Sequence, residues 1–289
     1  MLKPRLALAA SAAALAFLAL FFDVGRKLVA DWSTDDNYSH GFLVVPVALY
    51  FVWERRHRLV RAERAPSLLG LVVMLGSLLV LAAGTLGSEL FLTRIAILGM
   101  LVGVVLFVLG WSHLRLLAFP LAFLLLMVPL PALLFNQIAL PLQLLASQVG
   151  EAGLRAYGVP VLREGNVMLL ANTTLEVAEA CSGIRSLISL LTLGIVYGYF
   201  MDSRLWVRWL LALATVPIAV FTNGLRVAGT GIAAHTFGPA AAEGFLHTFS
   251  GWLVFVSALA LLFGLREIVS RLAPDPDMPG PLARSVEAS

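Results

Sequence analysis

Apolar residues occur along this chain in long runs separated by short polar segments. A run of about 17–20 apolar residues is long enough for a helix to cross the hydrocarbon core of a bilayer. The pattern predicts an all-α polytopic membrane protein with about eight transmembrane helices, at Leu6–Phe22, Gly41–Trp53, Ser67–Leu86, Ile95–Trp111, Leu114–Leu130, Ser186–Phe200, Leu205–Phe221 and Thr248–Leu265.

Two of these runs are less regular than the others. The first follows Lys3 and Arg5, as in a signal peptide, but it is long and lacks a small-residue cleavage site, so we expect an uncleaved span. The second, Gly41–Trp53, is short for a span, and Tyr38 and Trp53 would mark its two membrane interfaces.

The segment before the sixth run has a different pattern. Polar residues spaced among leucines in Pro131–Tyr157 indicate an amphipathic helix lying at the interface. Val159–Glu179 then alternates apolar and polar residues around Arg163-Glu164-Gly165-Asn166, which predicts a small β-hairpin with its turn there. We expect both elements outside the cytoplasm, just before the sixth helix.

Composition agrees with a membrane protein and excludes several other classes. The chain is 60% hydrophobic and 13% charged, with a mean hydropathy of +0.92, whereas soluble domains carry about 25% charged residues. A single cysteine excludes an internal disulfide framework. The sequence shows no zinc-type Cys/His cluster, phosphate-binding loop or dinucleotide fingerprint, so no metal or cofactor is expected.

The basic residues predict the orientation in the membrane. With the N-terminus inside, thirteen lysines and arginines fall on inner segments and five on outer segments, which satisfies the positive-inside rule. The Glu54–Arg58 stretch would then be a cytoplasmic anchor loop, although a nucleic-acid patch is the alternative. Residues 1–272 would form one membrane domain, and the Pro-rich tail 273–289 would be disordered, with both termini in the cytoplasm.

This topology places three polar sites at the outer surface of the membrane. Cys181 precedes the sixth span, Asn223 and Arg226 follow the seventh, and His247 precedes the eighth. Because all three ends face the same side, these residues are expected at one depth.

Cys181 has the surroundings of a reactive thiol. The positive end of a helix dipole and the nearby cation Arg185, one turn on, both favour the thiolate. The alternative is that Cys181 packs as a small apolar group, which is common for a free cysteine.

Arg226 and His247 also have two interpretations each. Arg226 is either an arginine reaching to the interface or a cation facing a wet site, positioned by Asn223 three residues earlier. His247 is either a hydrogen-bonded interfacial residue or a general base, and His235 in the same outer loop is a competing candidate. Together, a thiolate, a guanidinium and an imidazole suffice for acyl transfer, with Arg226 stabilising the oxyanion.

Three motifs resemble the exosortase/archaeosortase family of membrane cysteine transpeptidases. They are Glu179-Ala180-Cys181-Ser182-Gly183-Ile184-Arg185, Asn223-Gly224-Leu225-Arg226, and His247 within Gly244–Trp252. The stretch Asn37–Pro46 also looks like the N-terminal region of that family, so the resemblance runs from about Asp31 to Leu265.

The resemblance implies that Cys181, Arg226 and His247 are catalytic and that Arg185, Asn223 and Glu179 support them. Having histidine at the third position favours a bacterial exosortase, located in the inner membrane with its site facing the periplasm. Such enzymes process exported proteins that carry a C-terminal sorting signal: a motif such as Pro-Glu-Pro (PEP-CTERM), a transmembrane helix and a basic tail. They often accompany exopolysaccharide production.

Two other functions are compatible with the sequence, and the role of one residue is not determined by it. The first is a plain intramembrane cysteine protease, in which water accepts the acyl group. The second is a non-enzymatic transport or assembly protein for polysaccharide export. The few intramembrane charges argue against this function, because they cluster at one end and form no ionisable relay through the bilayer. The acceptor nucleophile and the role of His40 are not determined by the sequence.

Overall fold

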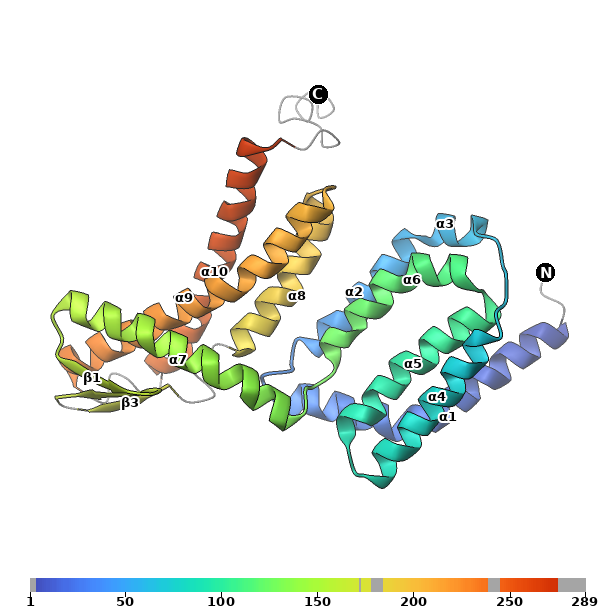
Figure 1. The fold of residues 1–289 in the computed structure, drawn as a ribbon, viewed down its shortest axis with the longest axis horizontal. Helices are drawn as coiled ribbons and strands as arrows, with labels where there is room; N and C mark the ends of the chain where they lie inside the picture. The colour runs from blue at the N-terminus through green and yellow to red at the C-terminus, as the bar shows by residue number, and fades with distance from the viewer. Residues whose placement is uncertain (1–3, 172, 178–183, 239–244, 275–289) are drawn as a thin grey trace. The chain divides into compact units, whose positions relative to one another are not determined.

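The computed structural model describes residues 4–171, 173–177, 184–238 and 245–274. The chain divides into two compact units, Met1–Ala132 and Leu133–Ser289. Each is described by itself below. The helices and strands of both units are labelled in Figure 1.

The first unit is helical. Its elements are α1 (Pro4–Thr34), α2 (Gly41–Glu54), α3 (Arg56–Arg61), α4 (Leu69–Leu86), α5 (Leu90–Val108), α6 (Trp111–Phe123) and the 3₁₀ turn η1 (Leu124–Met127). Helices α4 and α5 form a hairpin whose backbones touch through glycines. A Cβ on Gly70 would lie 2.2 Å from the backbone nitrogen of Phe107, and one on Gly103 would lie 2.6 Å from Cγ of Met74. Small residues allow this approach, which apolar helices in lipid use for association.

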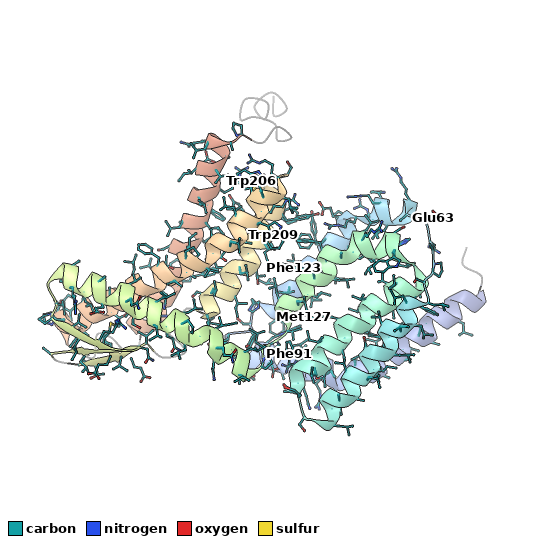
Figure 2. All side chains as sticks on the ribbon, viewed as in Figure 1. Glu63, Phe91, Phe123, Met127, Trp206 and Trp209 are labelled. Carbon is teal, nitrogen blue, oxygen red and sulfur yellow. The ribbon has the colours of Figure 1, made fainter. Side chains whose placement is uncertain are left out.

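The turn between α1 and α2 is fixed to η1 by two side chains. Trp32 Nε1 donates a hydrogen bond to the carbonyl oxygen of Met127 at 2.9 Å, and Nε2 of His40 lies 2.9 Å from the carbonyl oxygen of Leu126. Figure 2 draws all side chains as sticks and labels Met127 near the end of this helical segment. Both side chains are buried, so the polar turn is part of the core of the unit.

The second unit contains α7 (Ala132–Tyr157), which begins at its boundary, then a small sheet and three helices. The sheet has strands β1 (Val161–Glu164), β2 (Val167–Leu170) and β3 (Thr174–Glu176) in the antiparallel order β1-β2-β3. The helices are α8 (Ile184–Met201), α9 (Leu205–Phe237) and α10 (Phe245–Leu272). Figure 1 shows α8, α9 and α10 together, with α7 crossing near the sheet.

The sheet packs against α7 and α9 around a small apolar core of Ala146, Leu154, Val159, Met168, Val177 and Val227. Arg163 on β1 also pairs with Glu151 on α7, with Nε 2.7 Å from Oε2. The β1–β2 turn consists of Gly165 and Asn166. Gly165 has φ +66°, whereas the φ of Asn166 is not positive. A glycine with positive φ at the first central position, followed by a residue with negative φ, is the pattern of a type II′ hairpin turn. The predicted hairpin is therefore confirmed, with a third strand added.

At the other end of the helical bundle, the α8–α9 loop is held by ionic contacts. Oxygens of buried Asp202 accept hydrogen bonds from Arg204, Nε at 2.9 Å and Nη2 at 2.7 Å. Arg266 on α10 donates to the carbonyl oxygen of Met201 at 2.7 Å. The exposed side chains of Trp206 and Trp209, labelled on α9 in Figure 2, follow directly. Tryptophans at one end of an apolar helix are typical of a membrane interface.

Six helices in the described ranges are long and apolar enough to cross a membrane: Leu69–Leu86, Leu90–Val108, Ala132–Tyr157, Ile184–Met201, Leu205–Phe237 and Gly251–Leu272. Gly41–Glu54 and Trp111–Met127 are apolar but shorter. The prediction of a helical polytopic membrane protein with a small extra sheet is confirmed, but the count of eight full-length spans is not. The run Leu6–Phe22 lies within α1.

Three predicted positions are corrected by the structure. The segment Pro131–Tyr157, expected only at the interface, is one of the six helices of spanning length, although its buried residues do follow one face. The seventh span was expected to end at Phe221, but α9 continues to Phe237. Arg94, one of the five basic residues assigned to outer segments by the positive-inside rule, is buried in the first turns of α5 and pairs with Asp31 on α1.

Candidate active site

The predicted catalytic and supporting residues all belong to the second unit. Glu179 and Cys181 lie between β3 and α8, outside the described residues. The chain on either side of them is well anchored. Val177 is buried, and its N–H donates to the carbonyl oxygen of Asn166 at 2.9 Å. Ile184, the first residue of α8, is 2% exposed.

Helix α8 begins shortly after Cys181, as the sequence predicted. Its first two residues are Ile184, which faces the core, and Arg185, whose side chain is exposed. The first N–H groups of a helix have no intrahelical acceptor, and the helix dipole is positive there. The proximity of Arg185 to the thiol remains a prediction because the position of Cys181 is not described.

Asn223 is buried inside α9, with 2% of its surface exposed. The prediction put it at the outer end of a span, but it lies well before the end of the helix. Neighbouring Thr222 is also buried, and its hydroxyl donates to the carbonyl oxygen of Ile218 at 2.8 Å. A buried amide is retained where its polar atoms are satisfied, so this part of α9 is packed and polar rather than lipid-facing.

Arg226 is half-buried on α9, and its guanidinium lies against Gly251 on α10. A Cβ built on Gly251 would stand 3.7–3.9 Å from the Cζ and Nη atoms of Arg226, which is ordinary contact distance. The atoms nearest to that Cβ all belong to the guanidinium of Arg226, so the two helices meet at this point.

His247 lies in the first turn of α10, four residues before Gly251. Residues four apart occupy the same side of an α-helix. The contact between Arg226 and Gly251 therefore brings α9 to the helical turn that follows His247. The side chain of His247 lies outside the description, so its distance to Arg226 stays a prediction.

The two other histidines of interest lie elsewhere. His235, expected in the outer loop, is instead in the last turn of α9, and its side chain is exposed. His40 belongs to the first unit, at the end of the α1–α2 turn, where burial lowers the pKa of its imidazole and the nearby carbonyl of Leu126 opposes that shift. Its contact with Leu126 gives His40 a structural role in the first unit.

Sequence reasoning missed the glycines that hold α9 in place. A Cβ on Gly224 would come 2.4 Å from Cβ of Val149 on α7, and one on Gly150 would come 2.8 Å from Cγ1 of Val227. The signal was present as small residues at intervals of three or four: Ala146, Gly150 and Gly153 on α7, and Gly224, Ala228 and Gly231 on α9. Such spacing is typical of close helix pairs in membranes.

The length of α9 can be compared with the thickness of a membrane. A helix of 33 residues is about 50 Å long, which exceeds the ~30 Å hydrocarbon core. Arg226 lies about 30 Å along the helix from Leu205. If Trp206 and Trp209 mark the inner interface, Arg226 reaches the outer one, and the last turns of α9 extend beyond the membrane core.

Comparison with known protein families finds a match to the family described as transmembrane exosortase, over residues 32–264. That range covers both the described site residues and the segment carrying Cys181. Neither the curated proteins nor the solved structures provide a match.

Proposed function

This chain belongs to the transmembrane exosortase family, and we propose on that basis that it is a membrane cysteine transpeptidase. It would cleave the C-terminal sorting signal of exported proteins at the outer face of the inner membrane. The observation that supports this best is the placement of the Arg226 guanidinium against Gly251, one turn from His247. The anchored ends of the Cys181 segment belong to the same unit.

The first half of the reaction forms a thioester. His247 takes the proton of the Cys181 thiol, and the thiolate attacks the carbonyl carbon of the scissile peptide bond. The negative charge that develops on the carbonyl oxygen is stabilised by the guanidinium of Arg226. His247 then gives its proton to the departing amine, which carries away the transmembrane helix and basic tail of the substrate.

The second half transfers the acyl group. A nucleophile with an exchangeable proton attacks the thioester, and His247 accepts that proton. The Cys181 thiolate leaves and takes the proton back from His247, which regenerates the thiol and the neutral imidazole. Where the nucleophile is water the product is a free carboxylate, and where it is another acceptor the product keeps that group. The enzyme groups required are the same in both cases.

The proposed partners are exported proteins whose signal includes a transmembrane helix. Such a helix can approach between spans within the lipid, which would bring the cleavage motif to the membrane surface. Arg226, about 30 Å along α9 from Leu205, would be at that depth if the Leu205 end of α9 lies at the inner interface. A site at the interface therefore suits a substrate that is itself anchored in the bilayer.

The test is to co-express the protein with a tagged substrate carrying a C-terminal sorting signal. With wild-type enzyme we expect a shortened substrate, and with Cys181→Ala a full-length one, although the variant still inserts into the membrane. His235→Ala is the matched control for His247→Ala, because His235 is exposed at the end of α9. Normal processing by the Cys181→Ala variant would overturn the proposal.

The mass of the processed C-terminus separates transfer from hydrolysis. An added mass means that an acceptor was joined, and a free carboxylate means that water was used. Processing that is lost in His235→Ala and retained in His247→Ala would move the role of base to His235.

A further inference from the structure

The first unit contains a pocket of about 410 Å³ at the α4–α5 turn. It is lined by Asp23, Arg26 and Lys27 from α1, Thr85 and Ser88 from the end of α4 and the turn, and Arg94 from α5, among others. A pocket of this size holds a small polar group with part of what it is attached to. No step of the proposed reaction uses these residues.

Arg94 is the deepest cation in this pocket. Only 5% of its side chain is exposed, and Nη2 forms an ion pair with Asp31. Its Nε–H is buried and has no hydrogen-bond partner within the described residues. A buried donor without an acceptor is costly, so an acceptor atom entering the pocket would be favoured.

The pocket also lies at the N-terminus of α5. Glu89 precedes that helix but makes no side-chain hydrogen bond to cap it, and Leu90, the first helical residue, lines the pocket. The first N–H groups of a helix and the positive end of its dipole attract anions, phosphate in particular.

Charge in the pocket is predominantly positive. The only carboxylate lining it is that of Asp23, which lies 3.5 Å from Arg26 in an exposed pair. Lys27 is exposed and forms no ion pair with a described carboxylate. Arg94 pairs with Asp31 through Nη2, and its Nε has no hydrogen-bond partner among the described residues. The groups that remain are all donors: an ammonium, a guanidinium N–H and helix N–H groups.

Two large apolar side chains next in sequence to residues that line this pocket are exposed. Phe22 is 68% exposed beside Asp23, and Leu86 is 88% exposed beside Thr85. In a membrane protein such side chains contact acyl chains. A ligand with a phosphate and two hydrocarbon tails would satisfy both surfaces, whereas a free anion would satisfy only the pocket.

We propose that this pocket binds the phosphate group of an anionic membrane lipid, held by Lys27, Arg94 and the N-terminus of α5. Under the topology predicted from the sequence, the α4–α5 turn is at the outer surface, where a headgroup would be within reach. The site is separate from the Cys181, Arg226 and His247 residues and does not depend on the reaction proposed for them.

The experiment measures lipid retention by native mass spectrometry of the whole protein released from detergent micelles. Phosphatidylglycerol, phosphatidylcholine and inorganic phosphate are each added at equal concentration. We expect phosphatidylglycerol to be retained preferentially. The Lys27→Glu variant should retain it at least about fivefold less, since each basic residue near a membrane surface contributes roughly that factor. Arg61→Glu, an exposed change at the end of α3, is the control and should bind as the wild type does.

A double variant, Asp31→Asn with Arg94→Gln, removes the guanidinium without leaving its partner's charge behind, and it too should lose retention. If inorganic phosphate binds as well and needs Lys27, the phosphate chemistry is upheld but a free anion is the source. Equal retention of the two lipids without phosphate binding, or equal loss in Lys27→Glu and Arg61→Glu, would overturn the site.

Discussion

The two units each place an arginine in their interior, and the surroundings of the two differ. Arg94 in the first unit is almost fully buried and pairs with the carboxylate of Asp31 from another helix. Arg226 in the second unit is half-buried, and its guanidinium lies against a glycine of the neighbouring helix. Arg94 is thus fixed by a carboxylate of another helix in its unit, whereas the guanidinium of Arg226 packs against the backbone of the neighbouring helix.

The largest expected effect comes from Arg226. Its replacement by alanine should lower processing of a sorting-signal substrate by about 10²–10³-fold, as losing one oxyanion donor does. Lysine keeps the charge but not the planar fork, so Arg226→Lys should recover only part of the activity. The measurement is the initial rate of substrate shortening in membranes with equal amounts of each variant. Unchanged rates for both variants would remove Arg226 from the mechanism.

Arg94 should instead affect stability. Replacing it with methionine leaves the Asp31 carboxylate without its partner, and we expect a loss on the order of 2–3 kcal/mol, reduced from the fully buried case because Asp31 is 34% exposed. Thermal unfolding in detergent, followed by circular dichroism, measures it. The Asp31→Asn, Arg94→Gln pair should be closer to wild type than Arg94→Met, and the opposite order would show that the ion pair is not what stabilises this region.

Gly251 tests the space beside Arg226. An alanine Cβ would meet the guanidinium at 3.7 Å, so Gly251→Ala should change the processing rate less than about threefold. Leucine must displace the guanidinium, and a misplacement of about 1 Å costs on the order of tenfold or more. Gly264→Leu, on the same helix at an open position, is the control. Equal rates for Gly251→Leu and Gly264→Leu would mean that the contact has no part in catalysis.

The smallest effect concerns His40. Burial lowers the pKa of His40 from its ordinary value of 6.5, so the folded state resists protonation that the unfolded state accepts. Stability from this residue is therefore constant above pH 6.5 and decreases as the pH falls below it, by at most about 1.4 kcal/mol per pH unit. The melting temperature between pH 7.5 and 5.5 should fall less in His40→Gln than in the wild type. Identical slopes would contradict this assignment.

Local patterns predicted the helices and the hairpin well. The runs at Ser67–Leu86 and Ser186–Phe200 correspond closely to α4 and α8, because apolar length alone defines such helices. The turn at Gly165 was also predicted, since glycine there permits a positive φ. The end of the seventh span was wrong, because Asn223 and Arg226 look like a helix end by polarity while packing against other helices keeps them inside α9.

The sequence by itself determined that this is a membrane protein with a single cysteine before an apolar helix. Those features depend on hydropathy and charge, which are properties of each segment alone. Only the tertiary structure decided that Arg226 contacts Gly251, that Arg94 pairs with Asp31, and that His40 binds the backbone near Leu126. Each of these joins residues far apart in the chain, and their close approach depends on glycines and complementary groups on different helices, which no local pattern specifies.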